Sequence, residues 1–186
     1  GLENHEFIFH LQPKCNMATG ELVSMKALAR WQKSDGTFVS PGEFIPLFES
    51  SGFITRFDMY IWKSVCKTLA AWQDKGCKLV PISINVSMID ITNIDVPQYL
   101  SMLTEQYHIS PEYLPVEITE SVFAESNTIV KNTITRFHKK GFYVLMDDFG
   151  SGYSSLNVLK DANVDYLKLD MKFMQIDAKN KGKGIQ

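Results

Sequence analysis

The sequence has few of the residues on which redox and zinc chemistry depend. Its 186 residues include only three cysteines and four histidines. No two cysteines form a C-x-x-C pair, and an odd count excludes a fully paired disulfide framework. The histidines lack the spacing of a zinc site. We therefore expect a reduced, cytoplasmic setting.

A charge of one sign and long apolar runs are also missing. Lys+Arg 19 against Asp+Glu 21 gives a net charge of -2, which gives no support for binding a nucleic-acid polymer. No apolar run approaches the roughly 18 residues of a membrane span, and the first ten residues do not have the pattern of a signal peptide. With 45% hydrophobic and 22% charged residues, the chain is typical of one globular domain, or a large piece of one, without membrane contact.

Strand-like and helical segments alternate along the chain. The strand-like segments are Phe7–Gln12, Leu22–Trp31, Lys78–Val86, Leu114–Thr119, Phe142–Asp148 and Tyr166–Asp170. Helical spacing is found in the segments that start near Pro41, Phe57, Pro97, Asn127 and Ser154. Ser40 and Glu43 frame the first of these helices in the pattern of a capping box. Regular alternation predicts parallel strands and an α/β fold.

The period of two within the strands favours a closed barrel. Ser83 and Asn85 alternate with apolar neighbours, as do Glu117 and Lys168, so each strand has one apolar face and one face that is polar toward its C-terminal end. An open sheet covered by helices would be apolar on both faces. In a TIM-like (β/α) barrel the polar residues converge at the C-terminal mouth. The alternative is that surface polar residues end these strands by chance.

The residues expected at this mouth are mostly acidic. They are Asn85, Glu117, Asp147 and Asp148, with Lys168 opposite. Carboxylate and amide oxygens are ligands for Mg²⁺, Mn²⁺ or Ca²⁺ rather than zinc. A lysine beside them can stabilise charge that develops on a phosphate.

Seven segments together resemble one known family. They are LQP (Leu11–Pro13), KALARW (Lys26–Trp31), SPGEFIPLFESSG (Ser40–Gly52), NVS (Asn85–Ser87), EITES (Glu117–Ser121), MDDFGSGYSSL (Met146–Leu156) and VDYLKLD (Val164–Asp170). In order and spacing the chain resembles the EAL domain, the bacterial family of cyclic di-GMP phosphodiesterases. The resemblance implies a modified TIM barrel that linearises cyclic di-GMP with two divalent cations, usually Mg²⁺ or Mn²⁺.

The resemblance also implies roles for individual residues. Asn85, Glu117 and Asp147 would be metal ligands, and Asp148 would bridge or serve the second metal as part of the catalytic set. Lys168 would be the catalytic lysine near the attacked phosphate. Ordinary roles stay open for some of them: Asp147 could cap the following turn, and Lys168 could pair with Asp170 across a loop.

The remaining residues implied by the resemblance concern the substrate. Gln12 and Arg30 would contact the dinucleotide, and Tyr153 and Ser154 belong to the loop that shapes the metal site. Arg30 could instead be a solvated strand end.

The chain departs from the family pattern in two respects. The signature glutamate, a metal ligand in the family, is replaced by Lys26, and a protonated ammonium cannot coordinate a metal. A TIM barrel needs eight β/α units and about 250 residues, but six strands are recognised, so the C-terminal strands are expected to be missing from this chain. We expect residues 1–6 to end an upstream linker, 7–175 to form the EAL-like domain and 176–186 to form a polar tail.

Three functions follow from these departures. The first is a degenerate EAL module with weakly bound or absent metal that binds cyclic di-GMP or a partner without turnover. The others are an active phosphodiesterase that yields linear pGpG, and a purely structural or dimerising module. We expect a covalently linked upstream signalling domain of GGDEF or sensor type, and the open barrel edges would allow a homodimer.

Overall fold

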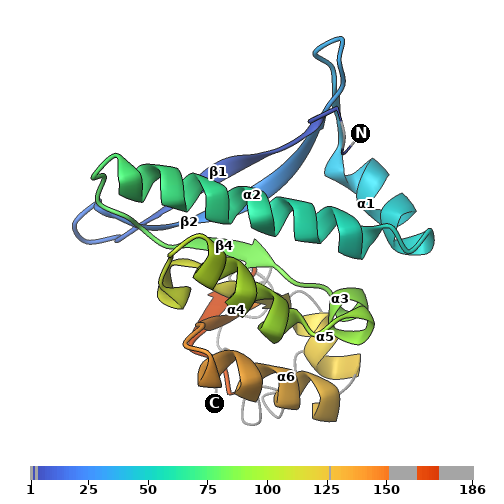
Figure 1. The fold of residues 1–186 in the computed structure, drawn as a ribbon. Coiled ribbons are helices and arrows are strands. Elements are labelled where there is room, and N and C mark those ends of the chain that lie inside the picture. The colour runs from blue at the N-terminus through green and yellow to red at the C-terminus, as the bar shows by residue number, and fades with distance from the viewer. Residues whose placement is uncertain (1, 3, 126, 151–162, 172–186) are drawn as a thin grey trace, which may run out of the picture.

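The strands form one sheet whose order follows the chain. The computed structural model describes residues 2, 4–125, 127–150 and 163–171, and within them the sheet runs β1-β2-β4-β5-β6-β7, with β3 paired to β2 (Figure 1). The strands are β1 (Phe7–Cys15), β2 (Leu22–Gln32), β3 (Phe38–Val39), β4 (Ile82–Asn85), β5 (Val116–Thr119), β6 (Val144–Phe149) and β7 (Tyr166–Leu169). The predicted α/β class is confirmed.

Neighbouring strands from β2 to β7 are parallel, whereas β1 and β3 run antiparallel to β2. The register pairs Lys26 with Ser83, Asn85 with Glu117, and Thr119 with Asp147. Because parallel strands end at the same edge, the polar residues of β4, β5 and β6 meet there.

Helices cover one face of this sheet. They are α1 (Pro41–Ser50), α2 (Ile54–Asp74), α3 (Met88–Asn93), α4 (Val96–Gln106), α5 (Glu120–Glu125) and α6 (Asn127–Lys139), with a short 3-10 turn at Pro111–Tyr113. Figure 1 shows α2 running along the β1–β2 hairpin, with α4 and α6 beyond β4. Apolar residues at helical spacing, such as Trp62, Val65 and Leu69 on α2, are fully buried against the strands.

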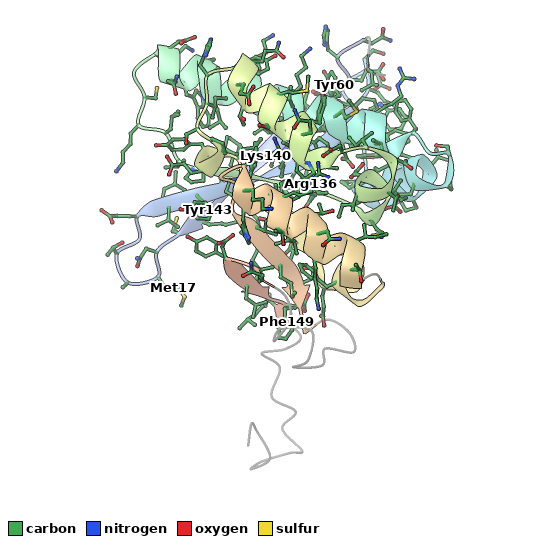
Figure 2. All side chains as sticks on the ribbon, turned by 60° about the horizontal axis from the view of Figure 1, so that its bottom comes forward. Met17, Tyr60, Arg136, Lys140, Tyr143 and Phe149 are labelled. Atoms are coloured by element: carbon green, nitrogen blue, oxygen red, sulfur yellow. The ribbon has the colours of Figure 1, made fainter. Side chains whose placement is uncertain are left out.

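Aromatic side chains join the N-terminal hairpin to the first two helices. The ring of Phe7 lies 5.3 Å from Trp31, 5.7 Å from Phe48 and 5.1 Å from Phe57. Phe44, only 1% exposed, completes the cluster. The other end of the hairpin extends away from the core, and Met17 at its turn is fully exposed (Figure 2).

The structure corrects several sequence-based expectations. Helix α1 starts as predicted, but the Ser40 side chain makes no capping hydrogen bond, so the expected capping box is wrong there. A capping box exists instead between Ser87 and Asp90 and opens α3, a helix that was not predicted. The strand expected at Lys78–Val86 is limited to Ile82–Asn85, and β3 and α5 were missed.

Other expectations fall outside the described residues. These are the helix near Ser154 and the polar tail at 176–186. Among the described helices none is long and apolar enough to cross a membrane.

Candidate functional site

The centre of the candidate site is the buried carboxylate of Glu117 on β5. The residue is 1% exposed, and its two oxygens accept bonds from three lysines. Lys14 Nζ lies 2.6 Å from Oε1. Lys26 Nζ and Lys168 Nζ lie 2.9 and 2.8 Å from Oε2. The hydroxyl of Ser83 also donates to Oε1.

Asp147 on β6 is held by two of the same lysines. Lys26 Nζ lies 2.6 Å from Oδ2, and Lys168 Nζ lies 2.7 Å from Oδ1. Oδ1 also accepts the backbone N–H of Asp148 at 3.0 Å, which is the local turn contact considered from the sequence. Lys168 therefore pairs across the sheet with Glu117 on β5 and Asp147 on β6.

The charges in this cluster stabilise one another. Burial raises the pKa of Glu117, but the charge of Lys26 and the hydrogen bonds from Lys14, Lys168 and Ser83 bring the pKa well below its usual range. Burial alone would lower the pKa of Lys26. The negative charge of Glu117 and the hydrogen bonds to Asp147 and Glu117 outweigh the effect of burial, so the pKa of Lys26 is raised. Glu117 is therefore ionised and Lys26 protonated at neutral pH.

Two predicted ligands lie outside this cluster. The side chains of Asn85 and Asp148 are exposed. The backbone carbonyl of Asn85 accepts the indole N–H of Trp62 at 2.9 Å, which fixes the end of β4 against α2. Asp148 has a φ of 57°, a left-handed conformation that is uncommon outside glycine. Burial and the charge of Asp147 raise the pKa of Asp148.

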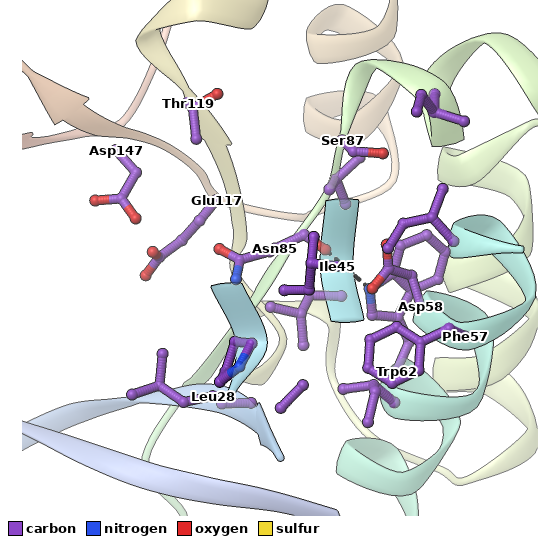
Figure 3. A pocket seen from close by; sticks show the side chains of 18 of the residues that line it. Leu28, Ile45, Phe57, Asp58, Trp62, Asn85, Ser87, Glu117, Thr119 and Asp147 are labelled. Carbon is purple, nitrogen blue, oxygen red and sulfur yellow. Dashed lines mark hydrogen bonds between the residues drawn. The ribbon is translucent and has the colours of Figure 1, made fainter. Parts of the chain in front are cut away.

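A cavity of about 560 Å³ opens beside these charges, between the sheet and α2 (Figure 3). Its polar lining residues are Lys26, Arg30, Glu49, Asp58, Asn85, Ser87, Glu117, Thr119, Ser121, Asp147 and Asp148. Apolar side chains such as Ile45, Phe57 and Trp62 form another part of the wall. A mixed apolar and polar cavity of this size is typical of a small-ligand site.

The predicted substrate residues differ in position. Arg30 lines the cavity, and its guanidinium donates to the carbonyl of Ala29 at 2.8 Å. Gln12 lies opposite Lys26 in the hairpin but is exposed and does not line the cavity. Tyr153 and Ser154 lie outside the described residues.

Sequence reasoning missed Lys14 and Trp62. Lys14 is two residues after Gln12, so the period of two places both side chains on the same face of β1. Its side chain reaches Ser83 at 3.0 Å as well as Glu117. Trp62 had no such signal, because its helical spacing indicates a core residue.

The oxygen atoms of Glu117 and Asp147 do not fit a divalent cation in this arrangement. All four of them face an ammonium group. Across the described part of the chain, no group of three or more His, Cys, Asp or Glu side chains is placed to hold a metal ion. These carboxylates instead form a cluster in which each oxygen is paired with an ammonium group.

Fold and site define an α/β domain with a charged mouth at the C-terminal ends of its parallel strands. The chain belongs to the EAL domain family, whose family model matches residues 1–185.

The comparisons with individual proteins support this membership. The chain is 36% identical over 173 residues to "Probable cyclic di-GMP phosphodiesterase PdeB" of Escherichia coli, covering 93% of this chain and 33% of that protein. It is 32% identical over 173 residues to "Signaling protein YkoW" of Bacillus subtilis, covering 93% of this chain and 22% of that protein. The chain thus spans a third or less of these relatives.

Solved structures agree with the barrel expectation. The chain matches "PaMucR Phosphodiesterase, c-di-GMP complex" with a TM-score of 0.84 and 28% identity, over 91% of this chain and 68% of that one. It matches the cAMP- and cyclic-di-GMP-bound EAL enzyme Bd1971 with a TM-score of 0.84 and 27% identity, over 96% of this chain and 50% of that one. The fold is therefore of the TIM-like barrel type of EAL domains, and the present chain is shorter than theirs.

Proposed function

We propose that this chain is a degenerate EAL domain of a bacterial cyclic di-GMP signalling protein, which binds the dinucleotide without hydrolysing it. The observation that carries this proposal is the ammonium of Lys26 between Glu117 and Asp147. By resemblance, Lys26 stands where the family signature has a metal-binding glutamate.

The electrostatics of Lys26 oppose the metal chemistry of the family. By resemblance, active members use two cations, Mg²⁺ or Mn²⁺, held by residues at the positions of Asn85, Glu117, Asp147 and Asp148. Replacing a carboxylate by an ammonium raises the local charge by two units. A unit charge pair about 4 Å apart interacts by roughly 4 kcal/mol at an effective dielectric of 20. Each cation would therefore be strongly disfavoured, and catalysis that depends on it would be lost.

The same cluster supports binding of an anion. Three ammonium groups face the two carboxylates of Glu117 and Asp147, so one positive charge remains in excess. Arg30 lines the adjoining cavity, and its guanidinium suits bidentate contact with a phosphodiester. In this proposal Lys26 and Lys168 take over the electrostatic role of the missing cations.

A titration in the presence of EDTA tests the proposal. We expect the full-length protein to bind cyclic di-GMP equally well with excess EDTA and with Mg²⁺, and to form no linear pGpG. Arg30→Ala should abolish binding, while Arg56→Ala, at an exposed position on α2, should not affect it. Loss of binding in EDTA would contradict a metal-free receptor, and absence of binding in both conditions would leave a structural role.

An active phosphodiesterase is the second candidate, favoured by the names of relatives such as PdeB. Formation of pGpG with Mg²⁺ or Mn²⁺ at rates typical of enzymes, about 1 s⁻¹ or more, would establish it. MucR of Pseudomonas aeruginosa, a "Bifunctional diguanylate cyclase/cyclic di-GMP phosphodiesterase" of which the chain covers 25%, supports the proposal of a covalently linked GGDEF-type domain.

A further inference from the structure

Two carboxyl groups from different helices meet beside the cavity, away from the lysine cluster. Asp58 is on α2 and lines the cavity, and Asp90 is on α3. Asp90 is wholly buried, at 0% exposure. Its Oδ2 accepts the backbone N–H of Ser87 at 2.9 Å and the hydroxyl of Ser87 at 2.7 Å. This capping box fixes the orientation of Asp90.

The other oxygen of Asp90 has no ordinary donor. Among the described residues, no N–H or hydroxyl group donates to Oδ1 of Asp90. The carboxyl of Asp58 lies within hydrogen-bonding reach of the carboxyl of Asp90. Leaving a buried oxygen without a donor destabilises the fold, and more so when the oxygen is charged. Two ionised carboxylates in contact would also repel each other.

The remaining charged surroundings are also acidic. Glu49 on α1 lines the same cavity and acts on Asp58 with a further negative charge. None of the ion pairs between described residues involves Asp58 or Asp90. Figure 3 shows Asp58 beside Trp62, on the side of the cavity opposite Glu117 and Asp147. A proton is therefore the simplest partner for this pair.

We propose that Asp58 and Asp90 share one proton, with Asp58 as a neutral carboxylic acid whose hydroxyl donates to Oδ1 of Asp90. This arrangement satisfies the buried oxygen and leaves a single negative charge on the pair. Burial, the charge and hydrogen bond of Asp90 and the charge of Glu49 raise the pKa of Asp58 to about 9.

The shared proton determines which ligands the cavity accepts, a consequence that rests on the proposed function. With Asp58 neutral, the α2 wall of the cavity carries no charge from that residue at pH 7, so an anionic dinucleotide can enter beside it. Above pH 9 the ionised carboxylate repels such a ligand. Ionised Asp58 also places a second negative charge beside Asp90 in the capping box, which begins at Ser87, two residues beyond the end of β4. Asp58 and Asp90 thus act together as a specificity-determining pair for an anionic ligand.

Carboxyl NMR of the ligand-free protein tests the shared proton directly. With aspartate labelled at ¹³Cγ, we expect one carboxyl that titrates near pH 9, and its signal should be missing in Asp58→Asn. In Asp90→Asn the neighbouring charge is removed, so the pKa of Asp58 should fall markedly. If the wild-type spectrum shows every described aspartate ionised at pH 7, the proposal is wrong, whether or not the protein binds a nucleotide.

A binding titration tests the functional consequence separately. From pH 7 to pH 10, one unit above the pKa of Asp58, the affinity for cyclic di-GMP should fall about tenfold more in the wild type than in Asp58→Asn. The variant keeps every lysine. The difference in pH dependence between the two proteins therefore reports the titration of Asp58 and not that of the lysines. Equal pH dependence in both proteins would overturn the specificity role. No binding by either protein at any pH would contradict the proposed function, while the NMR result would still decide the shared proton.

Discussion

The ammonium of Lys26 lies 2.6 Å from Oδ2 of Asp147, although 121 positions separate the two residues in the chain. Lys26 comes from β2 and Asp147 from β6, with β4 and β5 between them in the sheet. The side chain of Lys26 is 12% exposed and that of Asp147 is 7% exposed. This contact therefore spans the mouth of the sheet.

Lys26→Glu should restore divalent-cation binding. In the full-length protein the variant removes an ammonium and supplies a carboxylate at the mouth, so Mn²⁺ should bind measurably by calorimetry, whereas the wild type should not bind it. Lys26→Met is the matched control, because it removes the ammonium without adding an oxygen ligand. Equal Mn²⁺ affinity in the wild type and in Lys26→Glu would count against the role given to this residue.

Lys14→Met should destabilise the fold and weaken cyclic di-GMP binding. The variant removes the bond to Glu117 and the bond to Ser83, and hydrogen bonds to charged groups contribute about 1.5–3 kcal/mol. Because two other lysines still face Glu117, we expect the free energy of unfolding to fall by an amount near the lower end of this range. Urea unfolding measures the difference. Lys67→Met, on the exposed face of α2, should change stability by less than about 0.5 kcal/mol. Similar losses in both variants would show that Lys14 has no special role.

Ser87→Ala should cost about 1 kcal/mol of stability, whereas Ser40→Ala should cost almost nothing. Ser87 accepts the N–H of Asp90 at 3.1 Å and donates to its carboxylate, and loss of such a cap typically costs about 0.5–2 kcal/mol. Ser40 precedes α1 without a side-chain capping bond. Thermal unfolding of the two variants measures the contrast. A larger loss for Ser40→Ala would reverse the assignment of the capping box.

Asp58 should make the protein less stable as the pH rises from about 4 to about 9. In this window the unfolded chain has released the proton of Asp58, whose ordinary pKa is 3.8, while the native state retains it up to about pH 9. The unfolded state therefore binds fewer protons, and the free energy of unfolding falls with pH by at most about 1.4 kcal/mol per unit from this group. Urea unfolding at several pH values measures this dependence. In Asp58→Asn the free energy of unfolding should depend less on pH than in the wild type, and an unchanged dependence on pH would contradict the raised pKa of Asp58.

The strands could be predicted from the sequence because their inner and outer faces alternate in polarity. Met25 and Ala27 are buried under the helices while Lys26 points to the mouth, and this alternation also indicated that Glu117 and Lys168 would converge. In the structure Lys26 forms ion pairs with both Glu117 and Asp147. The roles of these residues in binding stay predictions.

Contacts that depend on tertiary packing could not be predicted in the same way. Ser40 has the sequence of a capping residue but makes no such bond, whereas Ser87 follows a strand by only two residues and caps a helix too short to show a period. Asp58 lies within the regular pattern of α2, and only the packing of α3 against α2 brings Asp90 to it.

The long separation between the members of the lysine cluster has a consequence for the order of folding. Lys14 and Glu117 are 103 positions apart, and Lys26 and Asp147 are 121 apart. Closing such loops costs entropy before the contacts can offset it. On the ribosome, the hairpin that carries Lys14 and Lys26 leaves the tunnel long before β5 and β6 exist. Its two ammonium groups therefore remain in water until the later strands arrive, so the mouth is among the last parts of the domain to form.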